Sequence, residues 1–327
     1  MRFAEKSTKG LMIIYSTAPS RISLLGGGSD LDSYAKLYGG KVLSMAINLR
    51  THVTLKTNDD IWGETKHHYP PNCDPKLLYA ILDKYGMNGL HHARVMSSFD
   101  GEIGAGLGSS ASFAVAMIAA LRRYQKLSMD KNIIAQEAAN MEIDTMGWYG
   151  GRQDQYASTY GGCNLILFNK EVKVTQLERS VCEKLQEWMV LIYLGGKRDS
   201  YKIQKKLEKL TKKQKQTMDA IKAYVIGGIV ALHAGNMELF ADILDCTWQL
   251  KKEFNPQKGN ENADDIYEVA KRNGAIGGKL LGAGGGGYFI CMVDPIWRKQ
   301  FISCMADHGI EETDFNISWD GVSTRII

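Results

Sequence analysis

Alternation of apolar and polar residues predicts strands in the first half of the chain. The longest alternating run, V-L-S-M-A-I-N-L-R-T-H-V-T-L-K-T at residues 42–57, predicts one long strand or a hairpin. A shorter run at Ile13–Ala18 predicts a strand that is broken at Pro19. Two further apolar runs, Ala93–Ser98 and Cys163–Phe168, predict strands of ordinary length.

Helical periodicity accounts for most of the other segments. In the first half it predicts helices at Leu31–Leu37, with Ser29-Asp30 as the N-cap, and at Leu77–Tyr85, Ser112–Lys126 and about Asn132 to Met146. In the second half the pattern predicts helices at Asp199–Lys213, Gln216–Ala234, Asn236–Glu253, Asn262–Arg272 and 296–307. It also predicts strands at Met189–Leu194, at Tyr288–Val293 and near Ile317. Residues 58–75 are polar and rich in turn formers, which indicates a loop.

Length and composition indicate a globular protein of two domains or of one large α/β unit. The chain has 327 residues, of which 44% are hydrophobic and 23% charged, and these shares are average for soluble domains. The charge-rich segment Glu171–Glu187 is the best candidate for a domain boundary. We therefore expect domains at residues 1–185 and 186–327.

Charge and cysteine content exclude several classes of function. A net charge of +4 allows anionic substrates without demanding nucleic acid, and the lysine-rich segment Lys202–Lys215 has its apolar residues at helical spacing, as in an amphipathic helix with a basic outer face. No apolar run reaches the roughly 18 residues of a membrane span, and the start lacks a convincing signal peptide. The scattered cysteines fit neither a disulfide scaffold nor a zinc site. We expect a cytoplasmic protein that binds neither nucleic acid nor membrane. The sequence does not decide whether the protein forms a homodimer.

The segment G-A-G-L-G-S-S-A-S, residues 104–112, is the main candidate for a ligand site. Its alternating glycines let the backbone approach a ligand closely, and a helix is predicted to follow. Backbone N–H groups at a helix N-terminus bind phosphate. The spacing differs from that of a dinucleotide-binding motif, and no lysine follows Gly108 as in a Walker loop. The sequence alone therefore leaves a phosphate loop and a flexible glycine linker as alternatives.

Two further glycine-rich motifs accompany this loop in a fixed order. They are A-P-S-R-I-S-L-L-G-G-G-S-D at residues 18–30 and K-L-L-G-A-G-G-G-G-Y at residues 279–288. With I-G-A-G-L-G-S-S-A at residues 103–111, the chain resembles the GHMP kinase superfamily over essentially its whole length. Ile103 stands where relatives usually have proline. The resemblance implies an α+β fold in two parts, an N-terminal domain like ribosomal protein S5 domain 2 and a ferredoxin-like C-terminal domain.

The resemblance also implies where ATP and Mg²⁺ would bind. Backbone groups of the second motif would hold the ATP phosphates, together with the glycines of the third motif; these residues are Gly104, Gly106, Leu107, Gly108, Ser109, Ser110, Gly284 and Gly285. The Ser110 hydroxyl would bind Mg²⁺ with a carboxylate that matches Glu142, although Asp144 nearby leaves this choice open.

The remaining roles concern the acceptor. Asp154 matches the family's catalytic aspartate; the alternative is an aspartate that only forms a turn. Arg21 matches the basic residue of the first motif; the alternative is an ordinary surface arginine. For the substrate the candidates lie in the first motif, after the Met189–Leu194 strand and in the third motif: Gly28, Ser29, Asp30, Lys197, Arg198 and Lys279. Asp30 could cap a helix, instead of binding the sugar or in addition to it. The Lys197-Arg198 pair could be a solvated helix start, and Lys279 could lie at the edge of its loop.

Within the superfamily, the segments G-G-G-S-D-L and G-R-Q-D-Q-Y-A-S-T-Y-G-G-C-N resemble the branch that phosphorylates sugars at the anomeric hydroxyl. This resemblance implies an ATP-dependent kinase, with D-glycero-D-manno-heptose 7-phosphate as the favoured acceptor in the biosynthesis of surface glycans. Another sugar, such as fucose, galactose or an N-acetylhexosamine, is the nearest alternative. A non-catalytic sensor of sugar or nucleotide with the same fold is the alternative from another class.

Overall fold

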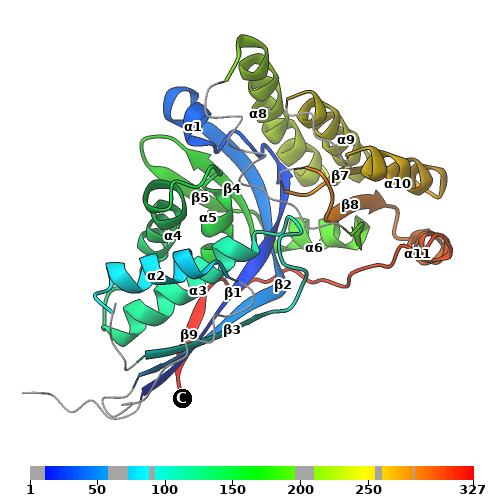
Figure 1. Cartoon of the computed structure of the whole chain (residues 1–327). Helices are drawn as coiled ribbons and strands as arrows, with labels where there is room; N and C mark the ends of the chain where they lie inside the picture. The colour runs from blue at the N-terminus through cyan, green and yellow to red at the C-terminus, as the bar shows by residue number, and fades with distance from the viewer. Residues whose placement is uncertain (1–11, 58–72, 88–92, 196–209, 255–259, 283) are drawn as a thin grey trace, which may run out of the picture.

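The computed structural model describes residues 12–57, 73–87, 93–195, 210–254, 260–282 and 284–327, and its larger sheet is antiparallel (Figure 1). The strand order is β5-β4-β2-β1-β9, with β3 also paired to β2. The strands are β1 (Met12–Leu25), β2 (Gly40–Thr57), β3 (Ala93–Phe99), β4 (Cys163–Phe168), β5 (Val172–Gln176) and β9 (Ser323–Ile326). The chain thus returns from its C-terminal part to pair with its first strand.

The two long strands test two of the predictions made from sequence. β2 is one continuous strand, which decides between the strand and the hairpin. β1 does not break at Pro19 but continues to Leu25, so that prediction is wrong. The pairing with β2 shifts register between Pro19 and Ser20, and this irregularity accommodates a residue without an N–H group.

Helices cover one face of the larger sheet (Figure 1). They are α2 (Pro75–Lys84), α3 (Ser109–Tyr124), α4 (Lys131–Asn140) and α5 (Gln153–Tyr160), with a π-helical turn at Met141–Thr145 after α4. The apolar side chains of α3 from Phe113 to Leu121 are all buried, because this helix lies between β1, β2, α4 and α5. Its many alanines allow this close packing on every side.

The smaller sheet lies on the other side of β1 and β2 (Figure 1). Its strand order is β6-β8-β7, and all pairs are antiparallel. The elements are β6 (Met189–Tyr193), β7 (Ala275–Leu280), β8 (Tyr288–Val293), α8 (Lys212–His233), α9 (Met237–Phe254), α10 (Asn260–Arg272) and α11 (Arg298–Asp307). One hydrophobic core contains residues of both sheets and of α8 and α9, including Leu24, Met45, Leu191, Leu244 and Ile290. The two halves are therefore packed together without an intervening linker.

Several predicted elements have other bounds or another form. The charged segment 171–187 contains β5 and most of α6 (Arg179–Trp188), so the proposed boundary at residue 185 falls within a helix. The strand near Ile317 is wrong: this residue makes an isolated bridge to Ile47, and the last strand is β9. Much of the predicted helix Asp199–Lys213 lies outside the described residues. α8 begins at Lys212, and its N-cap Thr211 forms a capping box with Gln214 in the first turn.

Two of the elements that were not predicted lie in glycine-rich segments. Residues 150–162 contain the helix α5, and the strand β7 runs into the third glycine motif. Both segments are rich in glycine and weak in periodicity, so pattern alone gave no signal. None of the helices in the described part of the chain is long and apolar enough to cross a membrane.

Candidate active site

The glycine loop at residues 104–108 leads directly into α3. Gly104, Gly106 and Gly108 have φ values of 74°, 98° and 76°, a region that L-residues rarely adopt. Gly108 is the N-cap and α3 begins at Ser109, three residues earlier than predicted. The first N–H groups of α3, including those of Ser109 and Ser110, therefore point out of the helix end, as at a phosphate site.

Two distant segments hold this loop in place. The backbone N–H of Arg21 donates to Leu107 O at 3.0 Å, and that of Tyr288 donates to Ala105 O at 2.9 Å. A Cβ atom on Gly287 would lie 2.3 Å from Ala105 O, so only glycine fits there. The first and third glycine motifs thus meet the second. Gly284 and Gly285, with φ values of 104° and 84°, belong to the loop that ends at Gly287.

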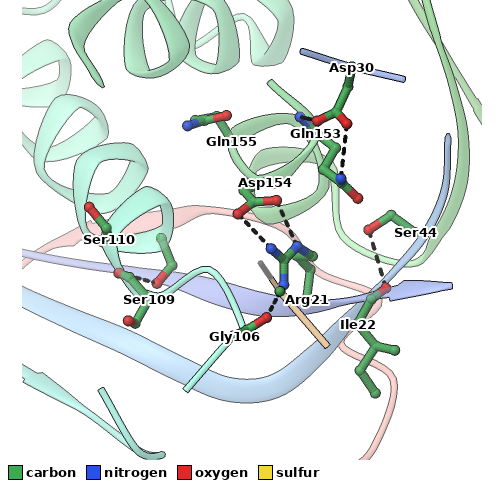
Figure 2. A network of polar contacts seen from close by, with 12 residues as sticks. Arg21, Ile22, Asp30, Ser44, Gly106, Ser109, Ser110, Gln153, Asp154 and Gln155 are labelled. Carbon is green, nitrogen blue, oxygen red and sulfur yellow. Dashed lines mark hydrogen bonds and ion pairs between the residues drawn. The ribbon is translucent and has the colours of Figure 1, made fainter. Parts of the chain in front are cut away.

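Arg21 and Asp154 form a bidentate ion pair beside the glycine loop (Figure 2). Arg21 Nε donates to Asp154 Oδ1 at 2.7 Å and Nη2 donates to Oδ2 at 2.6 Å. The third guanidinium nitrogen, Nη1, donates to Gly106 O at 2.6 Å. The arginine side chain is 6% exposed and the aspartate 24%, so the carboxylate is the member that a substrate can reach.

α5 explains the position of the carboxylate. Asp154 lies in the first turn of this helix, where the helix dipole favours a negative charge. A fixed guanidinium on one side and a helix end on the other orient both carboxylate oxygens. Such a group can accept or orient the proton of a hydroxyl that attacks a phosphoryl group.

Catalysis is predicted to be sensitive to a single methyl group added at Gly108. A Cβ atom at this position would lie 3.1 Å from Asp154 Oδ2, in addition to the strain of its positive φ. We expect Gly108→Ala to lower kcat at least ~10-fold, because it displaces the carboxylate. Gly309→Ala is the control, since its φ is 74° with open space around the methyl group. Both variants should lose similar thermal stability, and equal kcat values for the two would contradict the prediction.

Glu142 is a buried carboxylate that contacts the first turn of α3. Its Oε1 accepts a hydrogen bond from Ser110 Oγ at 2.5 Å, and its Oε2 accepts one from Gln155 Nε2. Asp144 lies elsewhere: it is half exposed and pairs with Arg152 at 3.1 Å. Of the two candidate carboxylates, only Glu142 therefore contacts Ser110.

The Glu142–Ser110 contact suits a hard cation. A carboxylate and a hydroxyl are oxygen ligands of the kind that Mg²⁺ prefers. Among the described residues no cluster of three or more His, Cys, Asp and Glu side chains could hold a metal ion. A cation at Glu142 would therefore need further oxygens from phosphate and water, as is usual for Mg²⁺ bound with a nucleotide.

Burial raises the pKa of Glu142 to about 7, and the nearby Asp154 charge adds to this shift. The folded protein therefore favours the protonated carboxyl, a contribution to stability that is present below about pH 4.5 and is lost as the pH rises through about 7. We expect the free energy of unfolding without metal to fall by roughly 3 kcal/mol over this range. Urea titrations of wild type and Glu142→Gln at several pH values test this prediction. The free energy of unfolding of the variant should lack this fall between about pH 4.5 and 7, and the same pH dependence in both proteins would refute the prediction.

Asp30 is held by the loop that precedes α5. Its carboxylate accepts hydrogen bonds from the Gly28 N–H at 2.9 Å, the Gln153 N–H at 3.0 Å and Gln153 Nε2 at 3.2 Å. It does not cap α1 (Asp32–Tyr38), whose N-cap is Leu31, so that alternative is wrong. Burial raises the pKa of Asp30. The arrangement brings Asp30 beside the residue that precedes Asp154 (Figure 2).

The other substrate candidates have different surroundings. Ser29 Oγ donates to Gly26 O at 2.8 Å and contacts Lys41 as well, which fixes the turn of the first motif. Lys279 is buried on β7, not at the edge of its loop, and its Nζ donates to Leu24 O at 2.9 Å. Lys197 and Arg198 lie outside the described residues.

Two glutamines of this region were not among the predicted site residues. Gln153 binds Asp30 through backbone and side chain, and Gln155 binds Glu142. Both flank Asp154 in the run R-Q-D-Q, which was the available signal. Arg152 in the same run is bound to Asp32, Asn140 and Asp144, which anchors the start of α5 to its neighbours.

Comparison with known proteins decides the family. The models named GHMP kinases N terminal domain and GHMP kinases C terminal match residues 76–162 and 229–310. The chain is 30% identical over 336 residues to D-glycero-alpha-D-manno-heptose 7-phosphate kinase of Campylobacter jejuni, covering 95% of this chain and 98% of that protein. The chain belongs to the GHMP kinase family. It is thus a small-molecule kinase with this family's two-domain fold, and GHMP kinases use ATP as phosphate donor.

Two other relatives show the breadth of this family. Mevalonate kinase of Archaeoglobus fulgidus is 28% identical over 278 residues, covering 83% of this chain and 89% of that protein. A crystal structure of a D-glycero-D-manno-heptose 1-phosphate kinase from Bacteroides thetaiotaomicron superposes with a TM-score of 0.75, at 24% identity and over 96% and 99% of the two chains. The similarity to the crystal structure concerns the fold.

Proposed function

We propose that this GHMP kinase transfers a phosphoryl group from ATP to the anomeric hydroxyl of a sugar, with D-glycero-D-manno-heptose 7-phosphate as the acceptor. The observation that carries the kinase chemistry is the Arg21–Asp154 pair, held against the glycine loop by the bond from Arg21 to Gly106 O. The choice of acceptor is supported by the similarity to the Campylobacter enzyme, which spans nearly the whole of both chains.

In this proposal each part of the site has one task. The N–H groups at the start of α3 bind the phosphates of ATP. Asp154 orients the acceptor hydroxyl and receives its proton, while Arg21 fixes the carboxylate and offsets negative charge during transfer. Ser110 and Glu142 would hold Mg²⁺, which neutralises charge on the phosphates when it is bound.

Asp30 would accept hydrogen bonds from hydroxyl groups of the sugar. A Cβ atom on Gly151 would lie 1.8 Å from Asp30 Oδ2, so Gly151→Ala must displace this carboxylate. We expect the variant to raise KM for the sugar roughly 10-fold or more and to leave KM for ATP within about twofold. Gly227→Ala on α8 is the control, because its methyl group would make only an ordinary contact of 3.5 Å with Ile243. Equal changes in the two KM values would contradict this role.

Other acceptors are the competing functions of this kinase. A coupled assay of ADP release over a panel of fucose, galactose, an N-acetylhexosamine, mevalonate and D-glycero-D-manno-heptose 7-phosphate separates them. The proposal predicts the highest kcat/KM for the heptose phosphate. A higher kcat/KM for an unphosphorylated sugar would assign that sugar as the acceptor, and ATP binding without ADP release on every acceptor of the panel would contradict the proposed transfer.

A further inference from the structure

Lys279 is a buried lysine to which the proposed transfer mechanism assigns no role. It lies on β7, is 3% exposed and donates one hydrogen bond, to Leu24 O on β1 at 2.9 Å. A lysine ammonium has three N–H donors, and the other two need acceptors when they are removed from water. A role that only ties β7 to β1 would use one of these donors.

A second lysine reaches the same end of β7 from α9. Lys251 is half buried, and its Nζ donates to Gly282 O at 2.5 Å, three residues after Lys279 in the chain. α9 and β7 lie very close together, since a Cβ atom on Gly277 would lie 2.2 Å from Ala241 O. Two ammonium groups thus approach the base of the third glycine loop from different elements.

Two other cations, Lys251 and Arg21, act on the Lys279 ammonium. Burial lowers the pKa of its ammonium well below the usual range, and Lys251 and Arg21 lower it further. Arg21 is already paired with Asp154, whose two oxygens face the guanidinium. A buried ammonium beside other cations is costly unless it loses its proton or an anion joins it.

We propose that Lys279 and Lys251 form an anion subsite that binds a phosphoryl group at the base of the third glycine loop. Phosphate supplies several acceptor oxygens and two negative charges, which match the remaining donors of Lys279 and the excess of positive charge. The group could be the terminal phosphate of the nucleotide or the phosphate of the acceptor, since both have this chemistry. The acceptor alternative rests on the proposed function; the binding of phosphate itself does not.

Calorimetric titration without turnover tests the subsite. The ligands are ADP, AMP, D-glycero-D-manno-heptose 7-phosphate and the unphosphorylated heptose, each with wild type and Lys279→Met. Methionine keeps an unbranched side chain of similar length without the charge. The control is Lys271→Met, because Lys271 also donates to a carbonyl of β7, Ile276 O at 3.0 Å, but from the exposed surface of α10.

We expect Lys279→Met to lower the affinity for either ADP or the sugar phosphate at least ~10-fold. The affinity for the matching ligand without that phosphate, AMP or the free sugar, should change less than about twofold. A loss for ADP but not AMP assigns the subsite to the nucleotide; a loss for the sugar phosphate but not the free sugar assigns it to the acceptor. Wild-type affinity for all four ligands would overturn the proposal. If Lys279→Met fails to fold, Lys251→Met must show the same selective loss. Turnover by wild type is measured separately, so a failed subsite and a failed kinase assignment give different results.

Discussion

Asp154→Asn is expected to lower kcat by roughly 10³-fold while the affinity for ATP changes less than about twofold. Asparagine keeps the size of the side chain but cannot accept the proton of the acceptor hydroxyl. It also loses one of the charge-assisted bonds from Arg21, which the carboxylate now receives at 2.6 and 2.7 Å. Rapid-quench measurement of the transfer step, with a separate ATP titration, separates chemistry from binding.

Asp144→Asn is the matched control for this variant. It makes the same chemical change close by in the chain, at a half-exposed carboxylate that pairs with Arg152 and not with Arg21. Its kcat should stay within about threefold of wild type. A similar loss in both variants, or a loss of ATP affinity in Asp154→Asn that accounts for the whole effect, would contradict a role of Asp154 in the transfer step.

Arg21→Lys is expected to lower kcat roughly 100-fold although the positive charge is kept. Arg21 holds both oxygens of Asp154 and the carbonyl of Gly106 at once, and a lysine ammonium cannot reproduce this planar fork. The carboxylate and the phosphate loop would then be able to move relative to each other. Steady-state kinetics and thermal melting of the same preparation give both the catalytic and the structural effect.

Arg50→Lys separates the two effects. Arg50 lies on β2 and donates to Thr17, Ser318 and Gly321, which ties the C-terminal segment to the sheet far from Asp154 in sequence. This variant should lose thermal stability to a comparable degree and keep nearly all of its activity. If the two arginine variants lose activity in equal proportion to their stability, Arg21 acts through folding alone.

The three glycine motifs allowed the fold and the family to be predicted from sequence, because glycine is required where the backbone must adopt a positive φ or approach another segment. Gly108 and Gly287 illustrate the two reasons. The predicted helices of the second half were also largely correct, since α9 and α10 have a clear apolar face. Their bounds moved by a few residues at most.

What the sequence could not give is the partner of each side chain. Arg21 and Asp154 are separated by 133 residues, and Asp30 and Gln153 by 123, so no local pattern pairs them. Asp30 had the sequence position of a helix cap, but the bridge between Leu31 and Gly151 brings α5 against it. Lys279 followed glycines in sequence as if in an exposed loop, whereas pairing with β8 buries it in β7.

The most direct test of the proposed activity is phosphorus NMR of the product formed from ATP and D-glycero-D-manno-heptose 7-phosphate by the wild-type protein. The proposal predicts a second sugar phosphorus signal whose coupling is to the anomeric proton, as in the 1,7-bisphosphate, together with one ADP for each sugar consumed. A new phosphate coupled to any other position, or no product from this sugar under conditions in which mevalonate or galactose is phosphorylated, would contradict it.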